Sequence, residues 1–250
     1  MYVFRKNSRC RSCNGDLNVM KLIQIFFLTF ILLGGCSKPD EPGNAYNPGS
    51  TEPGARFLAL GDSYTIGQSV SEAERWPVLF VKSLKSAGVQ FRSPDIIATT
   101  GWTTRDLITS VTNADPATNY DLVSLMIGVN NQFQGRSIDE YRSEFRTLLS
   151  KSIMLADGEP DHVFVLSIPD WGVTPYGESD RENIAKEIDA FNLVAKEECD
   201  KQKVIFVDIT PVSRQALNDP TMVARDNLHF SGKMHQLWVD TVIPLIKSRI

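Results

Sequence analysis

The stretch Phe57-Leu58-Ala59-Leu60-Gly61-Asp62-Ser63-Tyr64 decides the fold of this 250-residue chain. Its first four residues are all apolar, which predicts a short strand that is buried on both faces and ends at Gly61. A serine, Ser63, follows almost at once. In open α/β folds the working surface lies beyond the carboxyl ends of the strands, so Ser63 is the first candidate functional residue.

Apolar runs and amphipathic stretches alternate through the rest of the chain. Further strands are predicted at residues 95–98, 122–127, 163–168 and 204–207. Helices are predicted between them, at residues 77–84, 106–111, 138–149 and 184–195, and a last helix follows Ser231 as its N-cap. Five apolar strands alternating with helices indicate an α/β domain whose five-stranded parallel sheet is covered on both faces.

Polar or glycine-containing segments follow the predicted strands. They occupy residues 61–65, 100–102, 128–131, 169–172 and, after a longer connection, 226–229. The carboxyl ends of parallel strands lie at one edge of a sheet, so these segments are expected to meet. Together they offer a hydroxyl, a base, a carboxylate and several N–H donors, which is the set that an acyl-transfer site requires.

The choice of base is narrow because the chain has only three histidines. A serine hydroxyl becomes a good nucleophile when a neighbouring base takes its proton. His229 comes three residues after Asp226, so a turn can pair carboxylate with imidazole and fix the tautomer. His235 falls inside the last helix, and His162 begins a strand at the opposite edge. We therefore predict Ser63 as nucleophile, His229 as base and Asp226 as the residue that orients it.

Charge that develops on the substrate oxygen needs hydrogen-bond donors in fixed positions. The N–H groups of Ser63 and Gly101 are natural candidates, because both residues follow strands in tight turns. The side-chain amide of Asn130 can add a third donor. The alternative for Asn130 is a structural turn residue after Gly128, since asparagine favours turns.

Four blocks in the sequence resemble those of the SGNH, or GDSL-type, hydrolase family. They are, in order, Gly61-Asp62-Ser63-Tyr64, Gly101, Gly128-Val129-Asn130 and Asp226-x-x-His229. They run over almost the whole predicted domain. The resemblance implies a flavodoxin-like three-layer α/β/α fold and ester hydrolysis through an acyl-serine intermediate. It also implies an oxyanion hole made by Ser63 N–H, Gly101 N–H and the Asn130 side chain.

The chain departs from the family pattern at two positions. Tyr64 stands where leucine is usual, and Asn131 stands where aspartate commonly follows the asparagine of the third block. Neither residue belongs to the catalytic set that the resemblance implies. The change at Asn131 bears on hydrogen bonding within the turn more than on activity.

The substrate is less defined by the sequence than the chemistry. Asp62, Trp102 and Trp171 are candidate substrate-binding residues, and Phe133 and Tyr176 also fall in loops on the expected active face. Aromatic side chains there can line an acyl pocket or stack on sugar rings, whereas Trp171 can equally close the core. We expect short-chain or O-acetyl esters, with lysophospholipids or long acyl chains as the alternative.

Rival functions fit the sequence less well. A nucleotide or flavin binder would carry G-x-G-x-x-G or G-K-[ST], and neither motif is present. A nucleophile elbow, G-x-S-x-G, would need glycine where this chain has Thr65. A binding lipoprotein that kept the fold but lost the chemistry remains a second alternative. We expect no cofactor and no metal, because the Cys10–Cys13 pair lacks a matching second pair.

The N-terminal region predicts export. The apolar run at residues 22–33 is too short to span a bilayer and is typical of a signal peptide. Its end, Leu33-Gly34-Gly35-Cys36, resembles a bacterial lipoprotein signal, with Cys36 as the lipidated residue. An uncleaved membrane anchor is the alternative, and translation can start at Met1 or Met20. Either way we expect a protein anchored to the membrane, in the periplasm or at the cell surface.

Composition completes the predicted organisation. Residues 1–36 form the upstream segment and signal peptide, residues 37–54 a linker rich in proline and glycine, and residues 55–250 the hydrolase domain. The formal net charge of -4 offers no basic surface for nucleic acid. The expected partners are therefore an ester substrate and, through the lipid anchor, a membrane.

Overall fold

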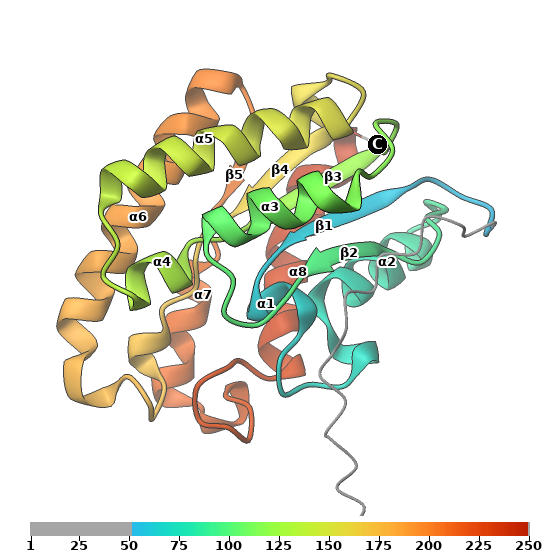
Figure 1. Ribbon diagram of the computed structural model, residues 1–250. Coiled ribbons are helices and arrows are strands. Elements are labelled where there is room, and N and C mark those ends of the chain that lie inside the picture. Colours follow the sequence, from blue (N-terminus) through green and yellow to red (C-terminus); the bar gives the residue numbers. More distant parts are fainter. Residues whose placement is uncertain (1–51, 250) are drawn as a thin grey trace, which may run out of the picture. The chain divides into compact units, whose positions relative to one another are not determined.

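A five-stranded parallel sheet forms the centre of the domain in the computed structural model, which describes residues 52–249. The expected signal peptide, Cys36, the Cys10–Cys13 pair and most of the linker lie outside the described residues. The strand order is β2-β1-β3-β4-β5 (Figure 1), and all four neighbouring pairs are parallel. The strands are β1 Phe57–Gly61, β2 Asp95–Ala98, β3 Leu122–Met126, β4 Val163–Leu166 and β5 Ile205–Val207.

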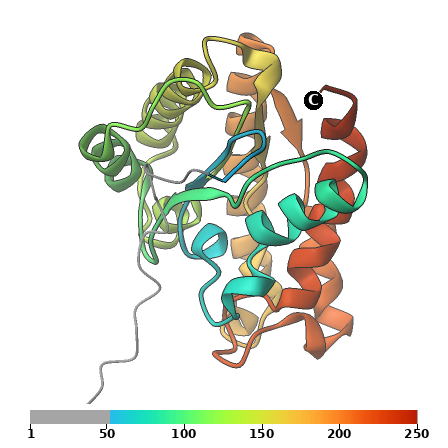
Figure 2. The same cartoon turned by 90° about the vertical axis from the view of Figure 1, so that its right-hand side faces the viewer.

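Helices cover both faces of this sheet. On one side lie α3 (Thr104–Ala114), α5 (Ile138–Leu155) and α6 (Arg181–Gln202), and on the other lie α2 (Trp76–Ser86) and α8 (Gly232–Ile246). Figure 2 shows the sheet between the two helical layers. The predicted three-layer α/β/α fold with a five-stranded parallel sheet is thereby confirmed. β1 to β4 are buried along their whole length, whereas Ile205 and Phe206 of the edge strand β5 are half-buried.

Local sequence signals explain where several helices begin. Thr103 accepts a hydrogen bond from the Asp106 N–H, while the Asp106 carboxylate accepts one from the Thr103 N–H, so a capping box starts α3. Ser231 occupies the N-cap position of α8, as predicted. Its hydroxyl, however, donates to the Thr221 carbonyl instead of capping the helix. The serine therefore holds the loop that precedes α8.

Short helices directly after three strands were not predicted from the sequence. These are α1 (Ser63–Ile66), α4 (Val129–Phe133) and α7 (Thr210–Ser213). Helical periodicity needs a longer window than four or five residues, so a one-turn helix leaves no such pattern. Figure 1 shows all three at the same end of the sheet. His162 also differs from expectation, because it ends a 3-10 turn, Pro160–His162, before β4.

An aromatic cluster anchors β1 to the layer that contains α2. Phe57 contacts Trp76, Phe80 and Phe164 with ring centroids 5.1–6.2 Å apart, and all four side chains are fully buried. Tilted, edge-on and stacked aromatic pairs of this kind add to the free energy gained from burial. The strand that leads to Ser63 is therefore held at its start by dense packing.

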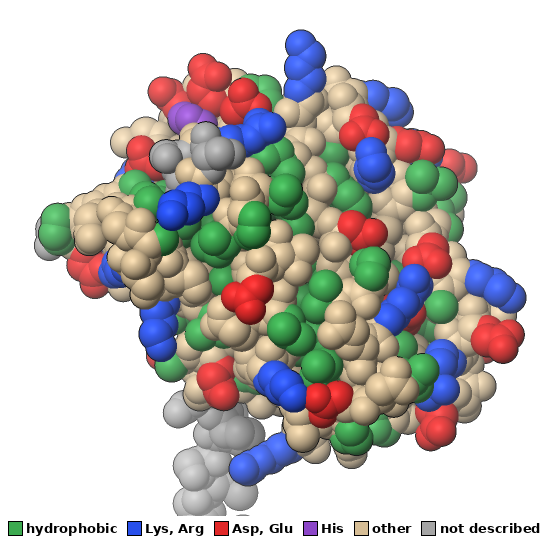
Figure 3. All heavy atoms as spheres, turned by 180° about the vertical axis from the view of Figure 1, so that it is seen from behind, with side chains coloured by type: hydrophobic (Ala, Val, Ile, Leu, Met, Phe, Trp, Pro, Cys, Tyr) green, Lys and Arg blue, Asp and Glu red, His purple; other side chains and the backbone are tan. Residues whose placement is uncertain are grey.

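The surface behind the view of Figure 1 mixes charges of both signs. Figure 3 shows Lys and Arg side chains interspersed with Asp and Glu, so this face carries no extended field of one sign. Among the described helices, none combines the length and the apolar composition needed to cross a bilayer.

Candidate active site

Ser63 is the first residue of α1, which follows β1 after a single residue. Asp62 caps this helix, because its carboxylate accepts a hydrogen bond of 3.1 Å from the Tyr64 N–H. The Ser63 side chain is nearly buried, with 4% of the residue exposed. Its N–H lies at a helix N-terminus, where N–H groups have no acceptor within the helix. One residue thus offers both a hydroxyl and a backbone donor at the end of β1.

Asp226 and His229 are paired by a tight turn. Asp226 Oδ1 accepts hydrogen bonds from the N–H groups of Leu228 (3.0 Å) and His229 (2.9 Å). Asp226 Oδ2 lies 2.6 Å from His229 Nδ1. Asn227, between them, adopts φ +62°, a left-handed conformation that asparagine tolerates better than most residues. The D-x-x-H spacing therefore produces the carboxylate–imidazole pair that was expected from it.

The carboxylate of Asp226 remains ionised throughout the neutral range. Partial burial acts to raise its pKa, but hydrogen bonds from Ser69, Leu228 and His229 outweigh that effect and lower the pKa to about 2. An ionised carboxylate accepts the proton on His229 Nδ1. In the neutral imidazole this assignment leaves Nε2 free to accept a proton.

Ser63 and His229 meet at one small cavity, which we call the Ser63 cavity. It measures about 70 Å³ and is lined by Ser63, Tyr64, Val129, Asn130, Phe133, Trp171, Leu228 and His229. Within the described part of the chain, the Ser63 and His229 side chains make no direct hydrogen bond to each other. Hydrogen bonds of this kind are often long before substrate binds. The cavity nevertheless brings together a hydroxyl, an imidazole and an amide from segments far apart in the sequence.

Asn130 has two contacts of different kinds. Its side-chain amide donates a hydrogen bond of 2.9 Å to the backbone carbonyl of Trp102, and the same side chain lines the Ser63 cavity. An amide group carries two N–H donors, so one is left for a substrate oxygen. The structural and the functional interpretations of Asn130 are therefore compatible.

Gly101 does not itself line the cavity. It adopts φ +85°, which favours glycine, and its neighbour Trp102 accepts the hydrogen bond from Asn130. A Cβ added at Gly101 would meet no atom within 4 Å, so backbone conformation and not space accounts for the glycine. The loop of Gly101 is thus joined to α4 next to the cavity.

The three candidate substrate-binding residues lie in different places. Asp62 is 1% exposed and caps α1, so it contacts the protein and does not line the cavity. Burial raises the pKa of Asp62 to about 7, although hydrogen bonds from backbone N–H groups act to lower it. Trp102 is half-buried against the core and does not line the cavity. Trp171 does line it, and its indole N–H donates to Gln132 Oε1 at 2.8 Å.

An aromatic rim, composed of Phe133, Trp171 and Tyr176, borders the cavity. The ring centroids of the three pairs are 5.4, 6.0 and 6.4 Å apart. Phe133 and Tyr176 are 52% and 56% exposed, whereas Trp171 is buried. The Tyr176 N–H donates to the carbonyl of Asn227, which connects the rim to the turn of Asp226 and His229. Aromatic surface is therefore exposed directly beside Ser63.

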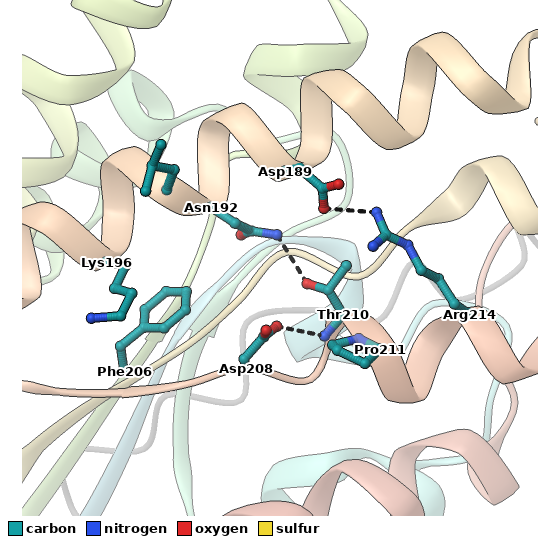
Figure 4. A pocket seen from close by; sticks show the side chains of 9 residues that line it. Asp189, Asn192, Lys196, Phe206, Asp208, Thr210, Pro211 and Arg214 are labelled. Carbon is teal, nitrogen blue, oxygen red and sulfur yellow. Dashed lines mark hydrogen bonds and ion pairs between the residues drawn. The ribbon is translucent and has the colours of Figure 1, made fainter.

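A buried ion pair fixes the segment that carries Trp171. Asp170 is 1% exposed and pairs with Arg214 at 2.8 Å, and its N–H donates to Ser213 Oγ. Arg214 also pairs with Asp189, and both line a second cavity of about 220 Å³ (Figure 4). Figure 4 shows Asn192 bonded to Thr210, Asp208 to the Thr210 N–H and Arg214 to Asp189, which fits a structural role for these side chains.

The structure adds residues that the sequence did not point to. Ser69 Oγ donates a hydrogen bond of 2.5 Å to Asp226 Oδ2 across 157 positions of sequence. No local pattern could reveal a contact at that separation. His235 is buried, with Nδ1 2.9 Å from the Glu74 carbonyl, and burial lowers its pKa to about 4. Among residues 52–249 no group of three or more His, Cys, Asp or Glu side chains could hold a metal ion.

The fold and the chemistry around the Ser63 cavity define a hydrolase that cleaves ester bonds. The chain belongs to the GDSL-like lipase/acylhydrolase family, whose model matches residues 59–237. This confirms the resemblance drawn from the four sequence blocks. A search of curated proteins gives no match.

Solved structures of several hydrolases share the fold. A lipolytic G-D-S-L family protein from Veillonella parvula has 16% identity and a TM-score of 0.59, covering 77% of this chain and 98% of that chain. A lipase/acylhydrolase from Enterococcus faecalis has 18% identity and a TM-score of 0.59, covering 78% of this chain and 96% of that chain. A variant acetyl xylan esterase from Geobacillus stearothermophilus has 22% identity and a TM-score of 0.58, covering 77% of this chain and 94% of that chain. At these identities the similarity concerns the fold alone.

Proposed function

We propose that the chain hydrolyses short-chain or O-acetyl carboxylic esters with Ser63 as nucleophile, His229 as base and Asp226 as the orienting carboxylate. The observation that carries this proposal is the single cavity shared by Ser63, His229 and Asn130. His229 Nε2 takes the hydroxyl proton while Ser63 Oγ forms a bond to the ester carbonyl carbon. The imidazolium then returns that proton to the leaving alcohol as the C–O bond breaks.

The second half of the reaction releases the acid. Water gives its proton to His229 Nε2 and attacks the acyl-serine carbonyl, and the Ser63 oxygen leaves with that proton. Asp226 stabilises the imidazolium in both halves, because its carboxylate stays charged at neutral pH and lies 2.6 Å from Nδ1. The Ser63 N–H, the free N–H of the Asn130 amide and the Gly101 N–H are the proposed oxyanion donors.

The size of the Ser63 cavity supports a short acyl group. Its volume of about 70 Å³ lies well below the roughly 300–1,000 Å³ of typical small-molecule pockets. An acetyl group fits such a space, whereas a long acyl chain would have to lie outside it. We therefore place long-chain esters and lysophospholipids second among the candidate substrates.

The alcohol side of the ester is proposed to be a sugar. Phe133 lines the cavity, and the exposed ring of Tyr176 packs beside it. Exposed aromatic rings of this kind can pack against the apolar faces of sugar rings. One of the structures with the same fold is an acetyl xylan esterase. O-acetylated glycans are accordingly the preferred natural substrates.

The decisive experiment measures ester hydrolysis by three variants. Ser63→Ala and His229→Ala should each lower kcat by several orders of magnitude, because each removes a group that forms or breaks a bond. His162→Ala is the matched control, since this half-buried histidine lies before β4, away from the cavity. If Ser63→Ala kept a kcat within about tenfold of the wild type, Ser63 would have no part in the mechanism, and a purely binding function would gain support.

The acyl preference is tested with p-nitrophenyl esters of increasing chain length and with acetylated glycans. The ratio kcat/KM should be highest for acetate or propionate and fall beyond butyrate. Higher values for octanoate or longer esters would favour the lipase alternative, with the acyl chain lying along the aromatic rim. A chelator should leave the rate unchanged, and loss of activity that a metal restores would contradict the proposal.

Export and anchoring are proposed from the sequence alone. The run at residues 22–33 followed by Cys36 supports processing as a bacterial lipoprotein. Expressed in a bacterium with radiolabelled palmitate, the full chain should incorporate label and sediment with membranes, and Cys36→Ser should do neither. Label on the Cys36→Ser variant would refute lipidation at this residue.

A further inference from the structure

The turn directly after α1 reaches two of the other loops around the Ser63 cavity. α1 ends at Ile66 and is capped by Gly67, whose N–H donates to the Ser63 carbonyl, and Gln68 N–H donates to the same carbonyl. Gln68 and Ser69 therefore follow the candidate nucleophile by one short helical turn. We call residues 67–69 the clamp turn.

Ser69 contacts the carboxylate that orients the base. Its hydroxyl donates to Asp226 Oδ2 at 2.5 Å, and this is the same oxygen that lies 2.6 Å from His229 Nδ1. Each oxygen of Asp226 is thus held by two donors, because Oδ1 accepts from two backbone N–H groups. The Ser69 hydroxyl fixes the side of the carboxylate that faces the imidazole.

Gln68 contacts the loop of Gly101. Thr100 Oγ1 donates to Gln68 Oε1 at 2.7 Å, and Thr100 immediately precedes Gly101. The loop of Gly101 is held from its other side by the bond between Asn130 and Trp102. Two neighbouring side chains of the clamp turn therefore reach two different segments, the turn before α8 and the Gly101 loop after β2.

The backbone of the clamp turn is unusual. Gly67 and Ser69 have φ values of +75° and +66°. Glycine adopts the left-handed region freely, but serine does so only against a steric cost. A glycine at position 69 would relax the backbone and lose the hydroxyl, so the two properties of this residue can be separated by substitution.

We propose that the clamp turn is a positioning device, in which Ser69 sets the Asp226–His229 pair and Gln68 sets the Gly101 loop relative to Ser63. This inference rests on the proposed catalytic roles of Ser63, Asp226 and His229. Ser69 and Gln68 act through other residues and contact no reacting atom. The turn ties the orientation of base and oxyanion donors to the segment that carries the nucleophile.

The test of Ser69 is a pair of matched glycine substitutions assayed with p-nitrophenyl acetate. Ser69→Gly should lower kcat about tenfold with KM nearly unchanged, because a hydrogen bond to a charged group is lost while the backbone is relaxed. Asp157→Gly is the control: Asp157, like Ser69, is an exposed non-glycine residue with positive φ, at +58°, but it lies in the loop before β4. It should relax the backbone in the same way and leave kcat unchanged.

A double-mutant cycle shows whether Ser69 acts through Asp226. In an Asp226→Ala background, Ser69→Gly should cause no further loss of kcat, because the hydroxyl has no carboxylate left to hold. Gln68→Ala should still lower kcat in that background, by about the same factor as in the wild type. The background rate measured with Ser63→Ala is subtracted from the rate of each variant. Thermal unfolding verifies that each variant folds.

Two results would overturn the inference. One is a Ser69→Gly variant with wild-type kcat, and the other is an equal loss of kcat with and without the Asp226 carboxylate. The failure of the proposed function looks different, because an active Ser63→Ala variant removes the mechanism whatever the clamp turn does. ¹H NMR gives a readout independent of turnover. The resonance of the proton shared by His229 Nδ1 and Asp226 should shift in Ser69→Gly and stay unchanged in Asp157→Gly.

Discussion

At the scale of single residues, the cavity depends on side chains that serve two partners at once. Asn130 donates one amide hydrogen to the Trp102 carbonyl, which leaves the other for the substrate oxygen that we propose it binds. Asp226 Oδ2 is shared by Ser69 and His229. Polar groups near a cavity are therefore committed to a geometry before substrate arrives, which is the preorganisation that electrostatic stabilisation requires.

Asn130→Ala should lower kcat by roughly 10²–10³ with a smaller change in KM, because an oxyanion donor acts in the transition state more than in the ground state. Steady-state kinetics with an acetate ester provides the measurement. Thr104→Ser, near the neighbouring Asn131, serves as the control, since it keeps the hydroxyl that accepts from the Asn131 amide. An unchanged kcat for Asn130→Ala would leave Asn130 as a structural residue only.

Asp62 should make the folding free energy depend on pH in the neutral range. Its pKa is raised by burial from 3.8 to about 7 in the folded chain. Between these values the unfolded chain favours ionisation and the folded chain opposes it. The contribution of Asp62 to the free energy of unfolding is therefore fully present below about pH 4 and is lost as the pH rises through about 7.

Asp62→Asn should flatten this dependence, because asparagine caps a helix as well as aspartate does but does not ionise. At pH 8 the variant should exceed the wild type in unfolding free energy by on the order of a few kcal/mol, and the difference should shrink toward pH 4. Chemical denaturation at several pH values measures it. If the unfolding free energies of the two proteins changed in parallel with pH, Asp62 would not titrate in this range.

At the scale of elements, each functional group is presented by a short helix or a turn. α1 presents Ser63, α4 presents Asn130, and the turn before α8 presents His229. Gly128 starts α4 with φ +128°, and a Cβ at that position would lie 2.6 Å from the ring of Tyr141 and 2.9 Å from Ile168. Tyr141 is fully buried, so it has little freedom to move away.

Gly128→Ala should therefore destabilise the domain by roughly 1–3 kcal/mol and displace α4 together with Asn130, lowering kcat. Gly135→Ala is the matched control, because Gly135 also has positive φ but a Cβ there would meet nothing within 4 Å. Thermal unfolding and turnover are measured for both variants. Similar losses of kcat would mean that backbone strain, and not the clash with Tyr141, limits the position.

At the scale of the whole molecule, the described residues contain every part of the proposed catalytic apparatus. The sheet, both helical layers and the Ser63 cavity all lie within residues 52–249. Glu52 accepts hydrogen bonds from Ser93, and Ala55 pairs with Phe91, so contacts with the domain begin within the segment predicted as a linker. The proposed chemistry therefore needs only groups from this part of the chain.

A chain that lacks residues 1–51 should fold and hydrolyse acetate esters like the full-length protein. We expect a Tm within about 2 °C and a kcat/KM within about twofold, since the buried core is intact. The same truncated chain should remain in solution when membranes are sedimented. Aggregation or loss of activity in the truncated chain would show that residues 1–51 support the fold.

The sequence predicted most of the fold because its signals are local. All five strands and the five long helices were placed from apolar runs and from helical spacing, although α5 and α6 extend six and seven residues beyond their predicted C-terminal ends. The strand order and the short helices α1, α4 and α7 do not follow from periodicity. The order depends on which strands pair, and a one-turn helix is set by the strand end that it follows.

The candidate site divides in the same way. Ser63, Asp226, His229 and Asn130 were recognisable because each belongs to a short motif directly beyond a strand or before a helix. Ser69, Gln68 and the aromatic rim were not assigned, or were assigned only loosely, because their contacts join residues far apart in the chain. The substrate role expected for Asp62 and Trp102 came from their neighbourhood in sequence, and the structure places both outside the cavity lining.

The sequence alone thus determined the elements, the family and the chemical groups, since hydrophobic periodicity and short motifs are properties of neighbouring residues. Tertiary structure alone decided which groups share a cavity, how large that cavity is and what holds each loop in place. The physical reason is that parallel strands bring their carboxyl ends to one edge whatever their separation along the chain. Packing then sets distances of a few ångströms that no local pattern encodes.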